Sequence, residues 1–126
     1  MFRNLIFDWS GTLVDDLGPV IEATNAVLCR YGLAPMDREN FRRQFRLPYR
    51  EFYAEILPDV PLDELESHFR PAFRASTAPV TILPHSREKL DWCRDLGIRC
   101  FVLTSMDESA FADQLAQFEL EQHFVA

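Results

Sequence analysis

The chain has 126 residues, which is enough for one domain or for one domain that carries an insertion. Hydrophobic residues make up 48% of the sequence and charged residues 26%, which is typical of a globular protein. A formal net charge of -7 argues against nucleic acid or an anionic membrane surface as a partner.

The first predicted element is a short buried strand in the run NLIFDW, which has Asp8 near its end. The next residues, Ser10 to Thr12, have the composition of a turn, and two further acids, Asp15 and Asp16, follow them. Residues 17–78 are predicted to be helical throughout. Apolar residues recur there at helical spacing in about four runs, separated by turns at 32–35, 46–48 and 58–61.

Residues 79–126 return to alternating elements. The pattern predicts a helix that ends at Gly97, a second buried strand in CFVL (100–103) and a last helix with Asp107 as its N-cap. A third strand is expected to begin in the final run, EQHFVA. Two parallel strands need a crossover connection, which here would carry an inserted helical domain. We therefore expect an α/β core from residues 1–16 and 79–126, with a helical insertion at 17–78.

Two polar residues follow the predicted strands directly, Asp8 after the first and Thr104 after the second. Ligands of open α/β sheets bind beyond the carboxyl ends of the strands. A carboxylate there can attack phosphorus, the Thr104 hydroxyl can bond phosphoryl oxygens, and Gly11 can let the backbone present N–H groups to an anion. The alternative is that Asp8 forms a turn and Thr104 caps one.

Two strings resemble the first two motifs of the haloacid dehalogenase (HAD) superfamily: FDWSGTLVDD, which contains Asp8, and FVLTS, which ends at Ser105. The resemblance covers essentially the whole chain and points to the subfamily with a helical cap after the first motif. It implies a HAD-like Rossmannoid parallel sheet, only part of which is present, with residues 17–78 as the cap. The implied activity is a phosphohydrolase that acts on a small phosphorylated metabolite through an aspartyl-phosphate intermediate, with magnesium as cofactor.

The resemblance also implies roles for single residues. Asp8 is implied as the nucleophile and as a magnesium ligand, and the backbone carbonyl of Ser10 as a second magnesium ligand. Asp15 matches an aspartate at the hinge into the cap, and N-capping of a helix together with Asp16 is an equal alternative. Phosphate contacts are expected from four positions: Gly11, Thr12, Thr104 and Ser105.

The side chain of Ser10 departs from the family's phosphatases, which carry an aspartate there as general acid and base. Loss of such a group typically slows a reaction by about 100- to 10,000-fold. The family's ion pumps carry a threonine there, and by that analogy a phosphoryl-enzyme would form and hydrolyse slowly. Its dehalogenases carry a tyrosine and would release halide without magnesium. Phosphonate-cleaving members use a cap lysine, whereas Lys89 lies outside the cap segment. A non-catalytic remnant that binds phosphate or a protein is a further alternative.

Arginines cluster in the segment FRRQFRLPYREFY. Arg46 is expected in a turn of the cap, where it could bind a second anionic group of the substrate, with Tyr49 beside it. A solvated helix face is the alternative for such a charge run. The resemblance places the family's third and fourth motifs, a basic residue and an acidic pair, beyond Ala126. We therefore expect a truncated chain, or the N-terminal portion of a longer hydrolase, whose missing half comes in cis or from an oligomeric partner.

The sequence has no apolar run of about 18 residues and no signal-peptide pattern, so a cytoplasmic protein is expected. The three cysteines, which lie in apolar surroundings without a CxxC spacing, are expected to be reduced core residues: Cys29, Cys93 and Cys100.

Overall fold

The computed structural model describes residues 1–125 and divides the chain into two compact units. Unit 1 comprises Met1–Leu17 and Pro79–Ala126, and unit 2 comprises Gly18–Ala78. The content is mixed α/β with a small parallel sheet, which confirms the fold class expected from the sequence. The assignment of residues 1–16 and 79–126 to a HAD core, and of 17–78 to a cap, stays a prediction.

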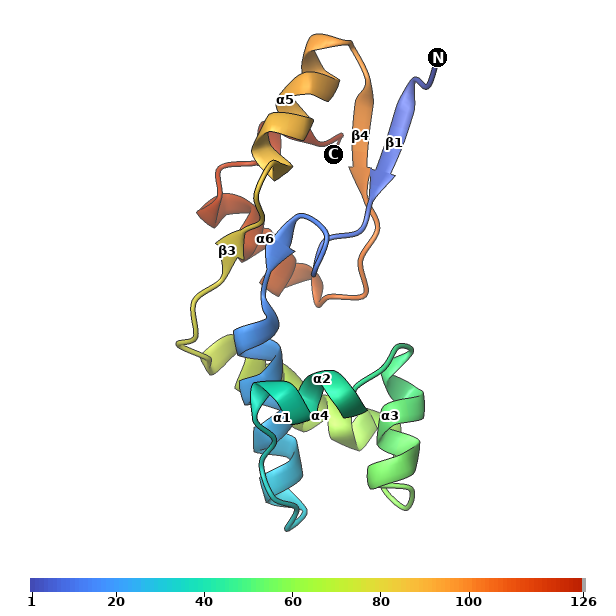
Figure 1. Cartoon of the computed structure of the whole chain (residues 1–126), viewed down its shortest axis with the longest axis vertical. Coiled ribbons are helices and arrows are strands. Elements are labelled where there is room, and N and C mark those ends of the chain that lie inside the picture. Colours follow the sequence, from blue (N-terminus) through green and yellow to red (C-terminus); the bar gives the residue numbers. More distant parts are fainter. Residues whose placement is uncertain (126) are drawn as a thin grey trace. The chain divides into compact units, whose positions relative to one another are not determined.

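The central element of unit 1 is a parallel pair of strands, β1 (Asn4–Phe7) and β4 (Arg99–Val102), which run side by side in the same direction (Figure 1). Phe7 pairs with Val102, so the two strands end in register. Beyond β4, a 3-10 helix, η1 (Glu121–His123), precedes an isolated parallel bridge between Phe124 and Cys100. The third strand expected in EQHFVA is therefore reduced to this bridge within residues 121–125.

The prediction that the first strand is buried is wrong. Ile6 is 69% exposed, whereas Leu5 and Phe7 are half-buried against the apolar core of unit 1. Successive side chains of a strand point to opposite faces of a sheet, and only one face of β1 packs on this core. An apolar run on its own does not reveal how many faces are covered.

The rest of unit 1 is built from two helices and a short strand pair. Helix α5 (Ser86–Asp95) ends before Gly97, whose φ of 69° suits a helix terminus, and α6 (Glu108–Gln117) begins after Asp107, as predicted. The Asp107 side chain accepts the Ala110 N–H at 3.2 Å. Strands β2 (Val14–Asp15) and β3 (Thr81–Ile82) pair antiparallel and join the two segments of the unit. They were not predicted, because two residues show no periodicity.

Unit 2 contains the four predicted helices: α1 (Leu17–Arg30, whose first residue belongs to unit 1), α2 (Arg38–Gln44), α3 (Tyr49–Ile56) and α4 (Leu62–Ala75). Gly32 follows α1 with a φ of 77°, as expected of a C-terminal cap. The helices enclose a core of buried side chains contributed by three of them: Val27, Phe52, Tyr53 and Leu65.

The three cysteines are free, but they do not share one environment. Cys93 and Cys100 are buried in the core of unit 1, as expected, and burial raises the pKa of the Cys100 thiol to about 11. The prediction for Cys29 is wrong, because this residue is exposed. It follows Val27 and Leu28 on α1 and lies just outside the buried stripe that those residues form. No helix within residues 1–125 is long and apolar enough to cross a bilayer.

Candidate active site

The register of the sheet brings two predicted site residues to one edge. The N–H of Leu103 donates to the carbonyl of Phe7 at 2.9 Å, so the chain leaves β1 and β4 at the same level. Asp8 is the first residue after β1, and Thr104 is the second after β4. Neighbouring parallel strands lie about 4.8 Å apart, which places these two loops next to each other.

The turn after Asp8 is tightly closed by its own backbone. The carbonyl of Trp9 accepts hydrogen bonds from the N–H groups of Thr12 at 3.1 Å and Leu13 at 2.9 Å. Gly11 has a φ of 76°, a conformation that residues with a side chain rarely adopt, and its N–H donates to Val14. The local sequence folds this way because glycine stands where the left-handed conformation is needed.

The buried side chain of Trp9 anchors this turn to the core. Its indole N–H donates to Oε1 of Gln114 at 2.7 Å, and its ring contacts Phe111 edge-on at a centroid distance of 4.9 Å. The polar atom of the ring is therefore satisfied inside the protein, which fixes one end of the turn. The sequence argument did not assign Trp9 a role, although a large residue directly after Asp8 was a visible signal.

The hydrogen bonds of the turn decide which of its backbone N–H groups have no backbone acceptor. Those of Gly11 and Thr12, the two turn residues predicted to contact phosphate, donate within the turn to Val14 and Trp9. In the part of the chain that the structure describes, the N–H groups of Trp9 and Ser10 donate to no backbone acceptor. Trp9 is fully buried and Ser10 is half-buried, so within this pair the Ser10 N–H is the candidate to bind an anion. Sequence reasoning missed it, since only the folded turn shows which amides are used.

The polar side chains of the turn form two separate hydrogen-bonded pairs. The exposed Asp8 carboxylate accepts a bond from the Thr12 hydroxyl at 3.2 Å. The Ser10 hydroxyl donates to Oδ2 of Asp16 at 2.6 Å. Oδ1 of Asp15 accepts the N–H of Leu17 at 3.2 Å, in keeping with a local capping role.

Asp16 is the residue of this turn that sequence reasoning undervalued. It is only 4% exposed, and burial raises the pKa of its carboxyl above the ordinary value of 3.8. The bond from Ser10 acts in the opposite direction, and the negative charges of Asp15 and Asp8 add to the rise. A buried carboxylate held against the hydroxyl of Ser10 is thus part of the candidate site.

The loop after β4 presents hydroxyl groups. Oγ1 of Thr104, which is half-buried, accepts the N–H of Met106 at 3.1 Å. This bond uses a lone pair of the hydroxyl and leaves its proton available for donation. Ser105 is exposed.

Two oxygen atoms of the turn after Asp8 are suitable ligands for a hard cation. The Asp8 carboxylate is exposed, and no backbone N–H within residues 1–125 donates to the Ser10 carbonyl. Both are the kind of oxygen ligand that magnesium prefers. Among the described residues, no group of three or more His, Cys, Asp or Glu side chains gathers as a metal site. This part of the chain therefore offers two oxygen donors to a cation.

The two residues predicted to contact substrate from the cap both have acidic partners in unit 2. Arg46 is exposed and pairs with Glu55, and its Nε lies 3.8 Å from Glu51. The Tyr49 hydroxyl donates to Glu66, a bond that raises the pKa of Tyr49.

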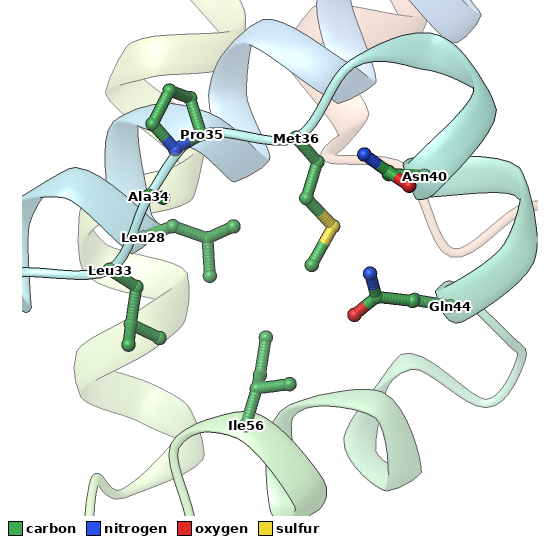
Figure 2. Close-up of a pocket in the computed structure, with 8 residues that line it drawn as sticks. All are labelled: Leu28, Leu33, Ala34, Pro35, Met36, Asn40, Gln44 and Ile56. Carbon is green, nitrogen blue, oxygen red and sulfur yellow. The ribbon is translucent and has the colours of Figure 1, made fainter.

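Unit 2 also contains a hollow of about 410 Å³, lined by Leu28, Leu33, Ala34, Pro35, Met36, Asn40, Gln44 and Ile56. Figure 2 shows the side chains of Leu28, Met36 and Ile56 pointing toward this space, with the carboxamides of Asn40 and Gln44 at one side. Its lining includes neither Arg46 nor Tyr49. The hollow is thus separate from the predicted substrate contacts.

A family model described as "Haloacid dehalogenase-like hydrolase" matches residues 5–126. The chain belongs to this family. The match includes both strand ends and every predicted site residue, which confirms the resemblance read from the two motifs. Phosphatases of this family generally use a divalent metal ion.

The HAD-like chain is similar to two curated bacterial proteins. A phosphoglycolate phosphatase of Pseudomonas fluorescens is 26% identical over 131 residues, which cover 97% of this chain and 48% of the relative. Phosphoglycolate phosphatase 1 of Pseudomonas aeruginosa is 25% identical with the same coverage. The chain thus spans about half the length of these relatives.

Solved structures show the same fold. A "predicted phosphatase" from Clostridium acetobutylicum superposes with a TM-score of 0.84 at 18% identity, covering 98% of this chain and 59% of that one. A haloacid dehalogenase-like hydrolase from Streptococcus pneumoniae gives a TM-score of 0.81 at 20% identity, with the same coverage.

Proposed function

We propose that this HAD-like protein is a phosphohydrolase that acts on a small phosphorylated metabolite through an aspartyl-phosphate on Asp8. The observation that carries the proposal is the exposed Asp8 carboxylate at the end of β1, in register with the hydroxyl-bearing loop after β4. An Asp8 oxygen would bond to phosphorus as the bond between phosphorus and the leaving oxygen of the substrate breaks. The leaving oxygen would then take a proton from solvent. Water would then release phosphate and restore the carboxylate.

The surrounding donors would stabilise the charge on the transferring group. The N–H of Ser10 and the hydroxyl of Thr104 could donate to phosphoryl oxygens, with Ser105 beside Thr104. Each preorganised donor of this kind contributes roughly 100- to 1,000-fold in rate. Thr12, through its bond to Asp8, would hold the nucleophile in one orientation. Gly11 would act by allowing the turn.

Magnesium is the proposed metal, held by the Asp8 carboxylate and the Ser10 carbonyl. When bound, it would neutralise charge on the phosphoryl oxygens. Acidic side chains elsewhere would have to complete its coordination, since this turn offers two oxygens and magnesium takes about six ligands.

The Ser10 side chain sets the expected rate. Serine has no carboxyl proton to give to a leaving alcohol, so phosphomonoesters should turn over about 100- to 10,000-fold more slowly than with an aspartate there. Acyl phosphates should suffer less, because their carboxylate leaving group needs no proton. We therefore expect the phosphoryl-enzyme to form faster from acyl phosphates than from phosphomonoesters.

The substrate class is also a proposal. The relatives are named for phosphoglycolate, which carries a carboxylate beside its phosphate. A second anionic group of this kind would suit Arg46, whose guanidinium can bind a carboxylate through two parallel hydrogen bonds, with Tyr49 beside it. Arg46 would have to exchange its present partners, Glu51 and Glu55, for the substrate.

The test is intact-mass spectrometry after incubation with acetyl phosphate and magnesium. We expect one added phosphoryl group on the parent and none on Asp8→Asn. Asp37→Asn is the matched control, because Asp37 caps α2 in unit 2 and asparagine caps equally well. An adduct on Asp8→Asn, or none on the parent, would contradict the proposal.

The second candidate is phosphate binding without turnover, which is favoured by the engagement of the Ser10 hydroxyl with Asp16. It requires phosphate affinity with no adduct in the same experiment. A dehalogenase would instead release halide from a haloacid without magnesium, and an ion-selective electrode detects that.

A further inference from the structure

We propose that Asp16 is a positioning residue, which turns the Ser10 hydroxyl so that its oxygen accepts a hydrogen bond from the water that attacks phosphorylated Asp8. This inference rests on the proposed aspartyl-phosphate function. It assigns a use to the residue that replaces the family's acid and base, and to the buried carboxylate behind it.

The bond between Ser10 and Asp16 has a defined direction. The Ser10 hydroxyl donates to Oδ2 of Asp16 at 2.6 Å, a short distance typical of a hydroxyl that bonds to a carboxylate. A serine hydroxyl has one proton and two lone pairs. Because the hydroxyl proton of Ser10 is used in the hydrogen bond to Asp16, Ser10 can offer only lone pairs to a further partner.

The Ser10 hydroxyl is held in one orientation. A free serine hydroxyl rotates among its rotamers, so its lone pairs have no fixed direction. Here Asp16 is 4% exposed, and the backbone on the other side of Ser10 is tied to the buried Trp9. Both ends of the arrangement are therefore fixed before a substrate binds, which is the condition for preorganised catalysis.

Ser10 also lies close to Asp8 along the chain. Ser10 is two residues from Asp8 in the closed turn, and its own N–H donates to no backbone acceptor among the described residues. Asp16, the partner of the Ser10 hydroxyl, belongs to the same segment between β1 and α1. Water that approaches phosphorus on Asp8 would come from solvent, since Asp8 is exposed and Ser10 is half-buried.

The chemical step requires only an acceptor. The water oxygen bonds to phosphorus, the bond from phosphorus to the Asp8 oxygen breaks, and Asp8 leaves as a carboxylate. Both hydrogens of the water stay with the phosphate product, so charge and atoms balance without a proton on the protein. Ser10 touches the attacking water and is catalytic in this sense, whereas Asp16 acts through Ser10.

The experiment separates formation of the adduct from its decay. The parent is phosphorylated with acetyl phosphate and magnesium, the reagent is removed, and loss of the adduct is followed by mass spectrometry. Acetate leaves without a proton, so formation does not need Ser10 or Asp16. A collapsed turn would slow both steps, whereas loss of the positioned water would slow decay alone.

Two matched pairs of variants carry the test. Ser10→Thr keeps the hydroxyl, and Ser10→Val replaces it with a side chain of the shape of threonine that has no hydroxyl. We expect decay of the adduct near the parent rate in Ser10→Thr. In Ser10→Val we expect the adduct lifetime to be longer by roughly 10- to 100-fold. Asp16→Ala should lengthen the lifetime in the same direction, and Asp37→Asn should leave it unchanged. In the Ser10→Val/Asp16→Ala double variant we expect little further change, because both substitutions remove one arrangement.

Each result has a distinct meaning. Unchanged decay in Ser10→Val and Asp16→Ala, with normal formation, would overturn this inference and leave the aspartyl-phosphate proposal intact. Slow formation together with slow decay in these variants would show a purely structural role and would also overturn it. No adduct on the parent would remove the proposed function and this inference together.

Discussion

The two units bury their apolar side chains in different ways. Unit 2 builds its core from stacked and edge-on rings, among them Phe45 against Phe52 at 5.2 Å and Phe52 against Tyr53 at 5.1 Å. Unit 1 has a compact core around Trp9, yet it leaves Ile6 69% and Leu103 72% exposed. A helical face is covered by neighbouring helices of the same unit, whereas a two-stranded sheet has one face packed. The candidate site lies in the unit whose apolar surface is less completely covered.

The largest expected effect is on the core of unit 2. Phe52→Ala should lower the free energy of unfolding by about 3–5 kcal/mol, because Phe52 is 1% exposed and its removal leaves a cavity. Ile6→Ala is the control in unit 1, and its effect should be within about 0.5 kcal/mol, as for an exposed residue. Urea denaturation measures both. Equal losses would contradict the difference in packing between the units.

A smaller effect is expected from Trp9, which anchors the turn after Asp8 to the core of unit 1. Trp9→Phe removes the indole N–H and leaves Oε1 of Gln114, which is 6% exposed, without its donor. An unsatisfied buried acceptor costs about 1–3 kcal/mol, which urea denaturation should detect. Gln114→Leu in the Trp9→Phe background should recover part of this loss. If it recovers none, the hydrogen bond is not what holds the turn.

Asp16→Asn should change the free energy of unfolding by roughly 1 kcal/mol, and this change should depend on pH. Because burial raises the pKa of Asp16 above 3.8, its stabilising contribution is complete below that value and is lost as pH rises through the higher, folded-state pKa. The variant should therefore be more stable than the parent near pH 7, in metal-free buffer, and the advantage should shrink toward pH 4. Thermal melts across this range measure it, and a constant difference would show that Asp16 is not destabilised by burial.

The smallest effect on stability is expected for Cys29→Ser, within about 0.5 kcal/mol, because Cys29 is exposed. A thiol reagent should modify Cys29 in the native protein and reach Cys93 and Cys100 only on unfolding. Burial and the raised pKa of Cys100, about 11, both oppose its reaction. Rapid labelling of Cys100 in the folded protein would show that the core of unit 1 opens.

The sequence revealed those features that local pattern determines. The helices of unit 2 followed from apolar spacing, and the Asp107 cap followed from residue type at a known position. The exposure of Ile6 could not be read from an apolar run, because burial depends on partners far away in the chain. The pairing of Ser10 with Asp16 and the use of the Gly11 amide inside the turn depend on turn geometry, which residue types alone do not specify.

The central claim is that Asp8 carries the phosphoryl group. An aspartyl-phosphate is an acyl phosphate, so borohydride reduces it to an alcohol that marks the modified residue. We expect peptide mapping after reaction with acetyl phosphate, magnesium and borohydride to find this mark at Asp8, and at no other aspartate of the first motif. A mark at Asp15 or Asp16, or an unmarked peptide despite turnover, would contradict the account.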